Sequence, residues 1–254
     1  MAKQILAPAR RETLDALFRD RLSIIQSKKG YRFSIDALLL AHFATARGGE
    51  RVVDLGTGNG VVALILASRY PSLKVAGLEI QEEMARRAVR SAALNRLGHR
   101  VSIVQGDVRE IEQFFPAGSF DVAVCNPPYR GVTSGRINPD PEKRVARHEI
   151  KARLRDFLRA AAYLLRSGGK IALVYPATRM VDLLQAMREE ELEPKRVRLV
   201  HSFEGSGAAL VLAEGVKGAS SELKIMPALI VYTKERKYTS EMSAVLAGRP
   251  SLSC

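Results

Sequence analysis

Cysteine is scarce in this sequence, which holds only Cys125 and Cys254 among its 254 residues. These two residues form no metal-ligand motif, and their number and spacing make no disulfide framework. We therefore expect no bound metal, and the low cysteine content fits a reducing compartment.

Long apolar runs are also missing. No segment approaches 18 uninterrupted apolar residues, the length typical of a membrane-spanning helix. The first residues, Met1-Ala2-Lys3-Gln4, lack the apolar run of a secretory signal. We expect a cytoplasmic protein without a membrane partner, a monomer built on one large α/β domain whose core requires no covalent staple.

Acidic residues are too few to balance the basic ones, since 27 against 40 gives a net charge of +13. Such an excess raises the local concentration of polyanions and speeds encounter with them. A solvated basic surface without a partner is the alternative explanation. We favour a nucleic-acid partner over a membrane lipid, because no amphipathic basic helix stands apart from the rest of the pattern.

The N-terminal segment is polar and basic, with a few apolar residues at regular spacing. Leu14, Leu17 and Phe18 have helical spacing and predict a helix, followed by an extended stretch. A second helix is predicted to start at Ser34 as its N-cap, with Asp36 in the first turn.

Three parts of the chain are distinguished on this basis. We expect residues 1–45 to be a helical extension, residues 46–235 the main domain, and residues 236–254 a poorly packed tail.

From residue 50 onward, apolar segments alternate with helical ones. Strands are predicted at 51–55, 73–78, 101–104, 120–124 and 170–175. Helices are predicted at 60–68, 81–95, about 149–166 and 178–190. This alternation indicates an α/β fold, Rossmann-like, with a mostly parallel sheet covered by helices on both faces.

The C-terminal third lacks long helices between its apolar segments. Strands are predicted at 197–201, 208–213 and 223–232. Consecutive strands joined by a turn pair in antiparallel fashion. We therefore expect a seven-stranded sheet that ends in an antiparallel C-terminal hairpin at one edge.

A glycine loop follows the first strand of the alternating region, in the run Asp54-Leu55-Gly56-Thr57-Gly58-Asn59-Gly60. Gly56, Gly58 and Gly60 allow a tight turn and close approach of a ligand to the backbone. Val61 occupies the place where the dinucleotide fingerprint requires its third glycine. Asp54 at the strand end also suits a cation better than a pyrophosphate, which indicates S-adenosylmethionine.

Acidic residues also follow the next two strands. Glu79, followed by Ile80, is predicted to accept hydrogen bonds from the ribose hydroxyls of the cofactor. Asp107 is predicted to bind the adenine amino group, with the Val108 N–H nearby. Singly, these acids could be turn residues, a helix N-terminal charge or an Asx-turn, but three successive strand ends beside one glycine loop favour the cofactor.

The motif Asn126-Pro127-Pro128-Tyr129 follows the fourth strand. Two prolines fix the backbone and remove two donors. The Asn126 side-chain oxygen, beside the cofactor, and the Pro127 carbonyl can accept both N–H groups of a planar amine, which stabilises positive charge as it develops. Tyr129 offers a face for stacking on a base. A rigid proline turn with a buried tyrosine is the alternative.

A basic stretch follows this motif, since residues 130–170 hold 11 basic and 4 acidic side chains, a net charge of +7. Cations here are placed to contact RNA phosphates where the substrate arrives. The predicted contacts are Arg136, Lys143, Arg144, Arg147, Lys151, Arg153 and Arg155. A solvated helix face is preferred for Arg159 and Arg166.

Other reactive residue types are given no catalytic role. His148 and His201 have no partner recognisable in the sequence, and we expect them on the surface or in the core. Cys125 ends a strand and is expected to be packed rather than reactive.

The chain resembles the bacterial valine-tRNA adenine-N6 methyltransferases over roughly residues 13–233. The resemblance rests on Ile24-Ile25-Gln26, the segment from Gly30-Tyr31-Arg32-Phe33-Ser34 to Ala41, the glycine loop, Asn126-Pro127-Pro128-Tyr129, and Pro227-Ala228-Leu229-Ile230-Val231-Tyr232. It implies a class I S-adenosylmethionine-dependent methyltransferase that acts on the adenine beside the anticodon of a tRNA.

By the same resemblance, Phe33, Ser34 and Asp36 cover the methionine end of the cofactor. The run from His201 to Gly205 departs from the family's His-Pro-Arg-like sequence.

Two other functions remain open. An N-methyltransferase for another RNA base, or for a protein glutamine amide, would use the same motif. The glutamine-directed enzymes usually carry a fuller N-terminal helical domain, and the +13 charge favours RNA. A cofactor-binding RNA module without activity is a different class, disfavoured by the intact Asn126 and Tyr129.

Overall fold

The computed structural model describes residues 8–18, 21–29, 32–128 and 153–249. Its strands are β1 (Glu12–Leu17), β2 (Leu22–Ser27), β3 (Arg51–Leu55), β4 (Lys74–Glu79), β5 (Val101–Gln105), β6 (Phe120–Cys125), β7 (Leu165–Pro176), β8 (Leu192–Phe203), β9 (Ala208–Lys217) and β10 (Lys224–Tyr232). Its helices are α2 (Ile35–Phe43), α3 (Val61–Arg69), α4 (Glu82–Leu94), α6 (Leu154–Leu164), α7 (Met180–Glu189) and α8 (Ser240–Leu246), with 3-10 turns η1 (Val108–Gln113) and η2 (Ala177–Arg179).

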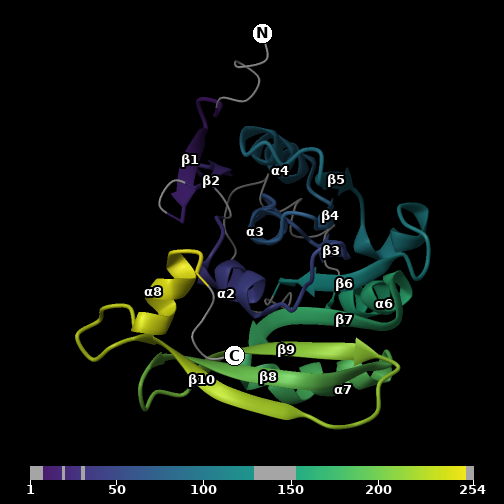
Figure 1. Ribbon diagram of the computed structural model, residues 1–254, viewed down its shortest axis with the longest axis vertical. Helices are drawn as coiled ribbons and strands as arrows, with labels where there is room; N and C mark the ends of the chain where they lie inside the picture. Colours follow the sequence, from purple (N-terminus) through teal and green to yellow (C-terminus); the bar gives the residue numbers. More distant parts are fainter. Residues whose placement is uncertain (1–7, 19–20, 30–31, 129–152, 250–254) are drawn as a thin grey trace, which may run out of the picture.

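Eight of these strands form one sheet in the order β10-β8-β9-β7-β6-β3-β4-β5 (Figure 1). The pairings β3–β4, β3–β6, β4–β5, β6–β7 and β8–β10 are parallel, whereas β9 is antiparallel to both β7 and β8. Only β9 among these eight therefore runs against the others. The carboxyl ends of the other seven meet at one edge, where ligands bind in open α/β sheets.

Two apolar clusters cover the two faces of the sheet. One contains residues of β2, α2, α3 and α8, and the other contains residues of η1, α6 and α7. The central strands are buried on both faces, as Val52 and Val53 illustrate with 0% exposure each. This explains why they were predicted well as continuous apolar runs. None of the helices in the described ranges is long and apolar enough to cross a membrane.

The N-terminal helix predicted from Leu14, Leu17 and Phe18 is wrong. Residues 12–17 and 22–27 form two antiparallel strands, β1 and β2, in which Glu12 pairs with Ser27 and Leu17 with Leu22. Leu17 packs against the core and Phe18 is 6% exposed, whereas Leu14 is 48% exposed. The spacing of the apolar residues therefore indicated two core residues but the wrong secondary structure.

The C-terminal region also differs from the prediction. The sheet has eight strands rather than seven, and the hairpin β8–β9 does not form its edge, because β10 pairs with β8 in parallel on the outside. Residues after 235 are not a poorly packed tail throughout. Met242 and Val245 of α8 are 0% and 1% exposed, and Glu241 accepts a hydrogen bond from Arg198 Nη2 at 2.8 Å.

Candidate cofactor site and catalytic loop

The predicted site residues follow four neighbouring strands. In the order β6-β3-β4-β5, Asn126 follows β6, the glycine loop follows β3, Glu79 ends β4, and Asp107 follows β5. Leu55 of β3 pairs with Leu78 of β4 and Cys125 of β6, so these strands end at the same level. The fold therefore brings the predicted cofactor and catalytic segments to one edge of the sheet.

The glycine loop depends on left-handed backbone at all three glycines, with φ of +72° at Gly56, +58° at Gly58 and +82° at Gly60. A Cβ at Gly60 would lie 3.0 Å from the Ala88 Cβ of α4, whereas a Cβ at Gly58 would meet no atom of the described residues within 4 Å. Gly60 thus lets two helices approach closely, and Gly58 borders open space.

Asp54 lies inside this loop and is 2% exposed. Its Oδ2 accepts hydrogen bonds from Thr57 Oγ1 at 2.6 Å and from the Ala63 N–H at 3.2 Å. Burial raises the pKa of Asp54 to about 7, and the nearby Glu79 carboxylate adds to that rise, against the two hydrogen bonds. Asp54 therefore holds the loop against the start of α3.

Glu79 is 5% exposed and links two backbone segments. Its Oε2 accepts from the Gly58 N–H at 2.9 Å, and its Oε1 accepts from the Gln81 N–H at 2.9 Å. Burial raises its pKa more than these N–H groups lower it. Ile80, the next residue, is half-buried.

Asp107 caps the 3-10 turn η1. Its Oδ1 accepts from the Arg109 N–H at 2.9 Å, and its carboxylate pairs with the Arg109 guanidinium. The hydrogen bonds from the Arg109 side chain hold the pKa of Asp107 below its usual range. The local turn considered from the sequence is thus present, and Val108 beside it is buried.

The catalytic loop leaves β6 at a buried position. Cys125 is 1% exposed, and burial raises the pKa of its thiol well above the usual value, so it is packed, as predicted. Asn126 is half-buried, Pro127 is buried and Pro128 is exposed. Tyr129 lies outside the described residues.

The segment leading into α2 is tied to the N-terminal hairpin. The Phe33 N–H donates to Gln26 Oε1 at 2.9 Å, and Gln26 is 1% exposed. Phe33 is half-buried against the core, and Ser34 takes the N-cap position as predicted, although its hydroxyl makes no capping hydrogen bond. Asp36 is half-buried in the first turn.

Most of the predicted RNA contacts, namely Arg136, Lys143, Arg144, Arg147 and Lys151, lie outside the described residues, as does His148. The Arg153 N–H donates to Asp156 Oδ2 at 2.6 Å at the start of α6. Arg155 forms an ion pair with Glu189 at 2.5 Å, so one acid already offsets its charge.

Three polar residues of the site were missed from the sequence. Thr57 bonds Asp54, Gln26 bonds Phe33, and Asn59 is 3% exposed with no hydrogen-bond partner for either amide atom among the described residues. Thr57 and Asn59 stand inside the glycine loop, which was the available signal. His201 was expected to be structural, and its Nδ1 lies 2.6 Å from the Ser206 carbonyl oxygen.

These groups fit a cationic nucleoside ligand. Buried carboxyl groups with raised pKa values, an unpartnered amide and open space at Gly58 lie on the edge where the helix α3 begins. Arg109, two residues after Asp107, is paired with that acid. In the described ranges, no group of three or more His, Cys, Asp or Glu side chains could hold a metal ion.

A mostly parallel sheet with one reversed strand and this strand-end site defines a class I, Rossmann-like methyltransferase that uses S-adenosylmethionine. The family model of the methyltransferase small domain matches residues 34–192. The chain belongs to this family.

Relatives of known function confirm the resemblance recognised in the sequence. The chain is 30% identical to the tRNA1(Val) (adenine(37)-N6)-methyltransferase of Porphyromonas gingivalis strain ATCC 33277, over 76% of this chain and 78% of that protein. It is 32% identical to the Aeromonas hydrophila protein of the same name, over 70% of this chain and 73% of that one.

A solved structure confirms the fold. That of a predicted O-methyltransferase from Agrobacterium tumefaciens superposes with a TM-score of 0.70 and 24% identity, over 85% of this chain and 97% of that one. The class I fold expected from the sequence is therefore confirmed.

Proposed function

We propose that the protein transfers a methyl group from S-adenosylmethionine to the N6 amine of an adenine in tRNA, the adenine beside the anticodon of valine tRNA. The observation that carries the proposal is the position of Asn126-Pro127-Pro128 directly after β6, beside the glycine loop of β3. The relatives named above carry this activity in their names.

The cofactor-binding residues are assigned by their place at the edge of the sheet. A Cβ at Gly58 would meet no atom of the described residues within 4 Å, and Glu79, which accepts from the Gly58 N–H, offers its carboxylate to the ribose. Asp107 and Val108 bind the adenine end of the cofactor. The remaining proposed contacts are Phe33, Ser34, Asp36, Asp54, Gly56, Gly60, Ile80 and Asn126. S-adenosylmethionine, when bound, supplies the methyl group and a positive charge that favours ionised carboxylates.

Asn126, Pro127, Pro128 and Tyr129 form the catalytic loop in this proposal. The Asn126 side-chain oxygen and the Pro127 carbonyl accept the two N–H bonds of the adenine amine, and Tyr129 stacks on the base. The amine lone pair forms the new N–C bond as the methyl–sulfur bond breaks, which leaves S-adenosylhomocysteine, and the methylated amine then releases one proton to solvent. A base reaches such a pocket only after it leaves its stack.

The RNA contacts after the catalytic loop remain part of this proposal, with Arg153 and Arg155 at its described end. A basic surface of this kind positions phosphates and makes binding decrease with salt. A tRNA substrate also places the protein in the cytoplasm, and we propose that it acts there as a monomer.

Labelled methyl transfer to bulk tRNA from cells that lack this protein tests the proposal, with a protein fraction of the same cells assayed in parallel. We expect label in tRNA alone and, after digestion, in N6-methyladenosine. Label in another nucleoside, or in glutamine of the protein fraction, would show that the substrate is not the one proposed. No transfer to either fraction would favour a binding module.

A further inference from the structure

Four exposed cations gather at the open end of the N-terminal hairpin. Arg10 and Arg11 precede β1, and Lys28 and Lys29 follow β2. The Lys28 N–H donates to the Arg11 carbonyl at 2.9 Å, and Lys28 Nζ donates to the Arg10 carbonyl at 3.0 Å. The backbone therefore holds these four exposed residues together at one end of the hairpin, and we term them the hairpin patch.

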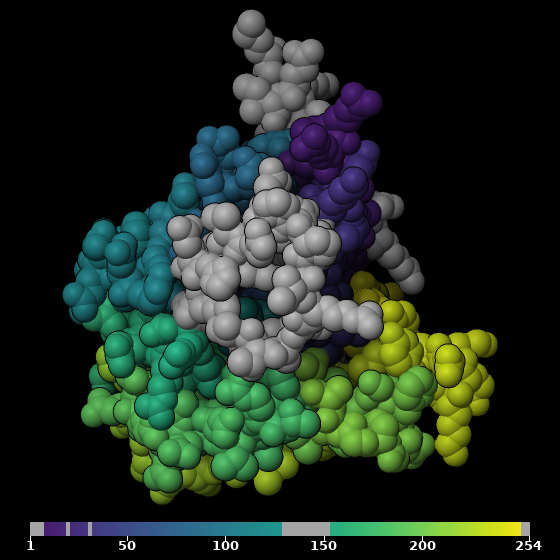
Figure 2. Space-filling model, turned by 180° about the vertical axis from the view of Figure 1, so that it is seen from behind, coloured from purple at the N-terminus to yellow at the C-terminus, as the bar shows by residue number. Residues whose placement is uncertain are grey.

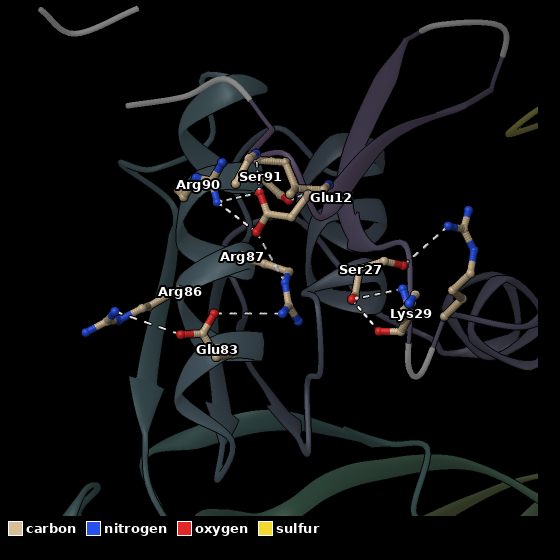
Figure 3. Close-up of polar contacts among 11 residues, drawn as sticks. Glu12, Ser27, Lys29, Glu83, Arg86, Arg87, Arg90 and Ser91 are labelled. Carbon is tan, nitrogen blue, oxygen red and sulfur yellow. Dashed lines mark hydrogen bonds and ion pairs between the residues drawn. The ribbon is translucent and has the colours of Figure 1, made fainter. Parts of the chain in front are cut away.

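Acids near the hairpin patch are already paired. Glu12 binds Arg87 and Arg90, as Figure 3 shows, and Asp15 binds Arg32. Glu82 and Glu83 of α4 pair with Arg86, and Glu83 also with Arg87. Glu12, Asp15, Glu82 and Glu83 thus pair with arginines outside the hairpin patch, namely Arg32, Arg86, Arg87 and Arg90.

Those ion pairs also fix the hairpin in place. The Glu12 carboxylate is 9% exposed and lies 2.8 Å from Arg90 Nη1 and 3.3 Å from Arg87 Nε. Burial alone would raise the pKa of Glu12, but the Ala9 N–H and the two guanidinium groups lower it overall. The hairpin patch is therefore preformed, and binding an anion there orders little new backbone.

The hairpin patch points toward the catalytic edge of the sheet. The helix α4 starts just after the carboxyl end of β4. The Ser23 N–H bonds Asn95, beyond the far end of α4, whereas Glu12 bonds Arg87, nearer its start. The open end of the hairpin thus lies toward the start of α4, and the two elements border one face of the molecule (Figure 2). Lys29 also leads along the chain to Phe33.

We infer that Arg10, Arg11, Lys28 and Lys29 bind phosphates of the RNA substrate, at a contact separate in the sequence from the basic stretch after the catalytic loop. The inference rests on the proposed tRNA substrate. A folded RNA is large enough to reach both this surface and the catalytic loop. Phosphate contacts of this kind fix orientation without reading sequence.

Replacing Arg10, Arg11, Lys28 and Lys29 together by Gln tests the inference, with affinity for valine tRNA measured over a range of salt. We expect the wild-type affinity to fall at least tenfold at low salt. The slope of log affinity against log salt becomes shallower by roughly 3, since each phosphate contact contributes about 0.7 to 0.9. KM for tRNA rises, while affinity for S-adenosylmethionine and the melting temperature stay unchanged.

A matched variant carries the same loss of charge at the amino edge of the sheet, through Arg47→Gln, Lys74→Gln, Lys195→Gln and Lys224→Gln. Its salt slope should change by less than 1. An equal effect of both variants, or an unchanged slope in the hairpin variant, overturns the inference. The inference is also overturned if the hairpin variant loses binding to phosphatidylglycerol vesicles while its affinity for tRNA is unchanged. Wild-type protein that neither binds nor methylates tRNA would instead contradict the proposed function.

Discussion

The Gly58 N–H donates to Glu79 Oε2 at 2.9 Å, so the glycine loop of one strand is fixed by a carboxylate at the end of the next. The other oxygen of Glu79 accepts from the Gln81 N–H at the entrance to α4. One side chain therefore positions two backbone segments. Loop geometry and cofactor binding should be lost together when Glu79 is changed.

Glu79→Ala should weaken binding of S-adenosylmethionine at least tenfold, or about 1.4 kcal/mol. The variant loses the acceptor for two N–H groups and the proposed acceptor for the ribose. The cofactor affinity of Glu79→Gln should lie between those of the wild type and Glu79→Ala, because the amide offers only one acceptor oxygen. Isothermal titration calorimetry measures both. Glu82→Gln, three residues further and exposed, is the matched control and should bind as the wild type does. Equal affinities for Glu79→Ala and the control would remove Glu79 from the site.

The Glu12 carboxylate should stabilise the docking of the hairpin on α4. Glu12→Gln leaves Arg87 and Arg90 without their shared partner at a position that is 9% exposed. We expect the free energy of unfolding to fall by roughly 1–3 kcal/mol. Urea unfolding measures the change.

Glu83→Gln is the control for that experiment. Its side chain is 70% exposed, and its ion pairs with Arg87 and Arg86 are 3.8 and 3.9 Å long. Exposed pairs of this kind contribute little, so the change should stay within about 0.5 kcal/mol. Similar losses in the Glu12 and Glu83 variants would show that burial at Glu12 does not matter.

His42 should make the protein acid-sensitive. Burial, with a smaller contribution from Arg69, lowers the pKa of His42 to about 4 from 6.5. Between pH 6.5 and 4, His42 is protonated in the unfolded chain but remains neutral in the folded protein. The free energy of unfolding therefore decreases as pH falls from 6.5 to 4, by up to about 3 kcal/mol. His42→Leu should remove this part of the decrease, measured by urea unfolding at pH 7 and pH 5. Parallel pH dependence in both proteins would contradict it.

In the cofactor-free protein, Asp54 should change the pH dependence of stability in the direction opposite to His42. Its pKa is raised to about 7 from 3.8 in the folded state, so the folded protein holds a proton that the unfolded chain releases. Stability therefore decreases as pH rises from 3.8 to 7, by roughly 4 kcal/mol at most. Asp54→Asn should lack this decrease, even though loss of the bonds to Thr57 and Ala63 lowers its stability overall. Unfolding at pH 5 and pH 8 separates the two effects.

The central strands, and the place of the proposed site residues at one edge of the sheet, were predictable because their signals are local. Buried parallel strands are continuous apolar runs, and the residue after each strand end must lie at the ligand edge. Asp54, Glu79, Asp107 and Asn126 were therefore placed correctly in relation to one another. Their hydrogen-bond partners were not, because these depend on the loop conformation.

The two ends of the chain were predicted wrongly for physical reasons. In the hairpin, Glu12 binds arginines 75 and 78 residues away in the sequence, and the local spacing of apolar residues cannot indicate such contacts. The helix α8 is short and buries Met242 and Val245. Its local signal was Thr239, whose hydroxyl caps the helix by accepting from the Met242 N–H at 3.2 Å. The charged residues just before Thr239 made this N-cap hard to recognise in the sequence.

The most direct test of the account is Asn126→Ala, assayed for methyl transfer to valine tRNA and for affinity toward S-adenosylmethionine in the same preparation. The account predicts loss of N6-methyladenosine formation by at least a hundredfold, since one oriented acceptor contributes about that factor, with cofactor affinity within a few-fold of the wild type. Turnover like that of the wild type would contradict the assignment of the catalytic loop.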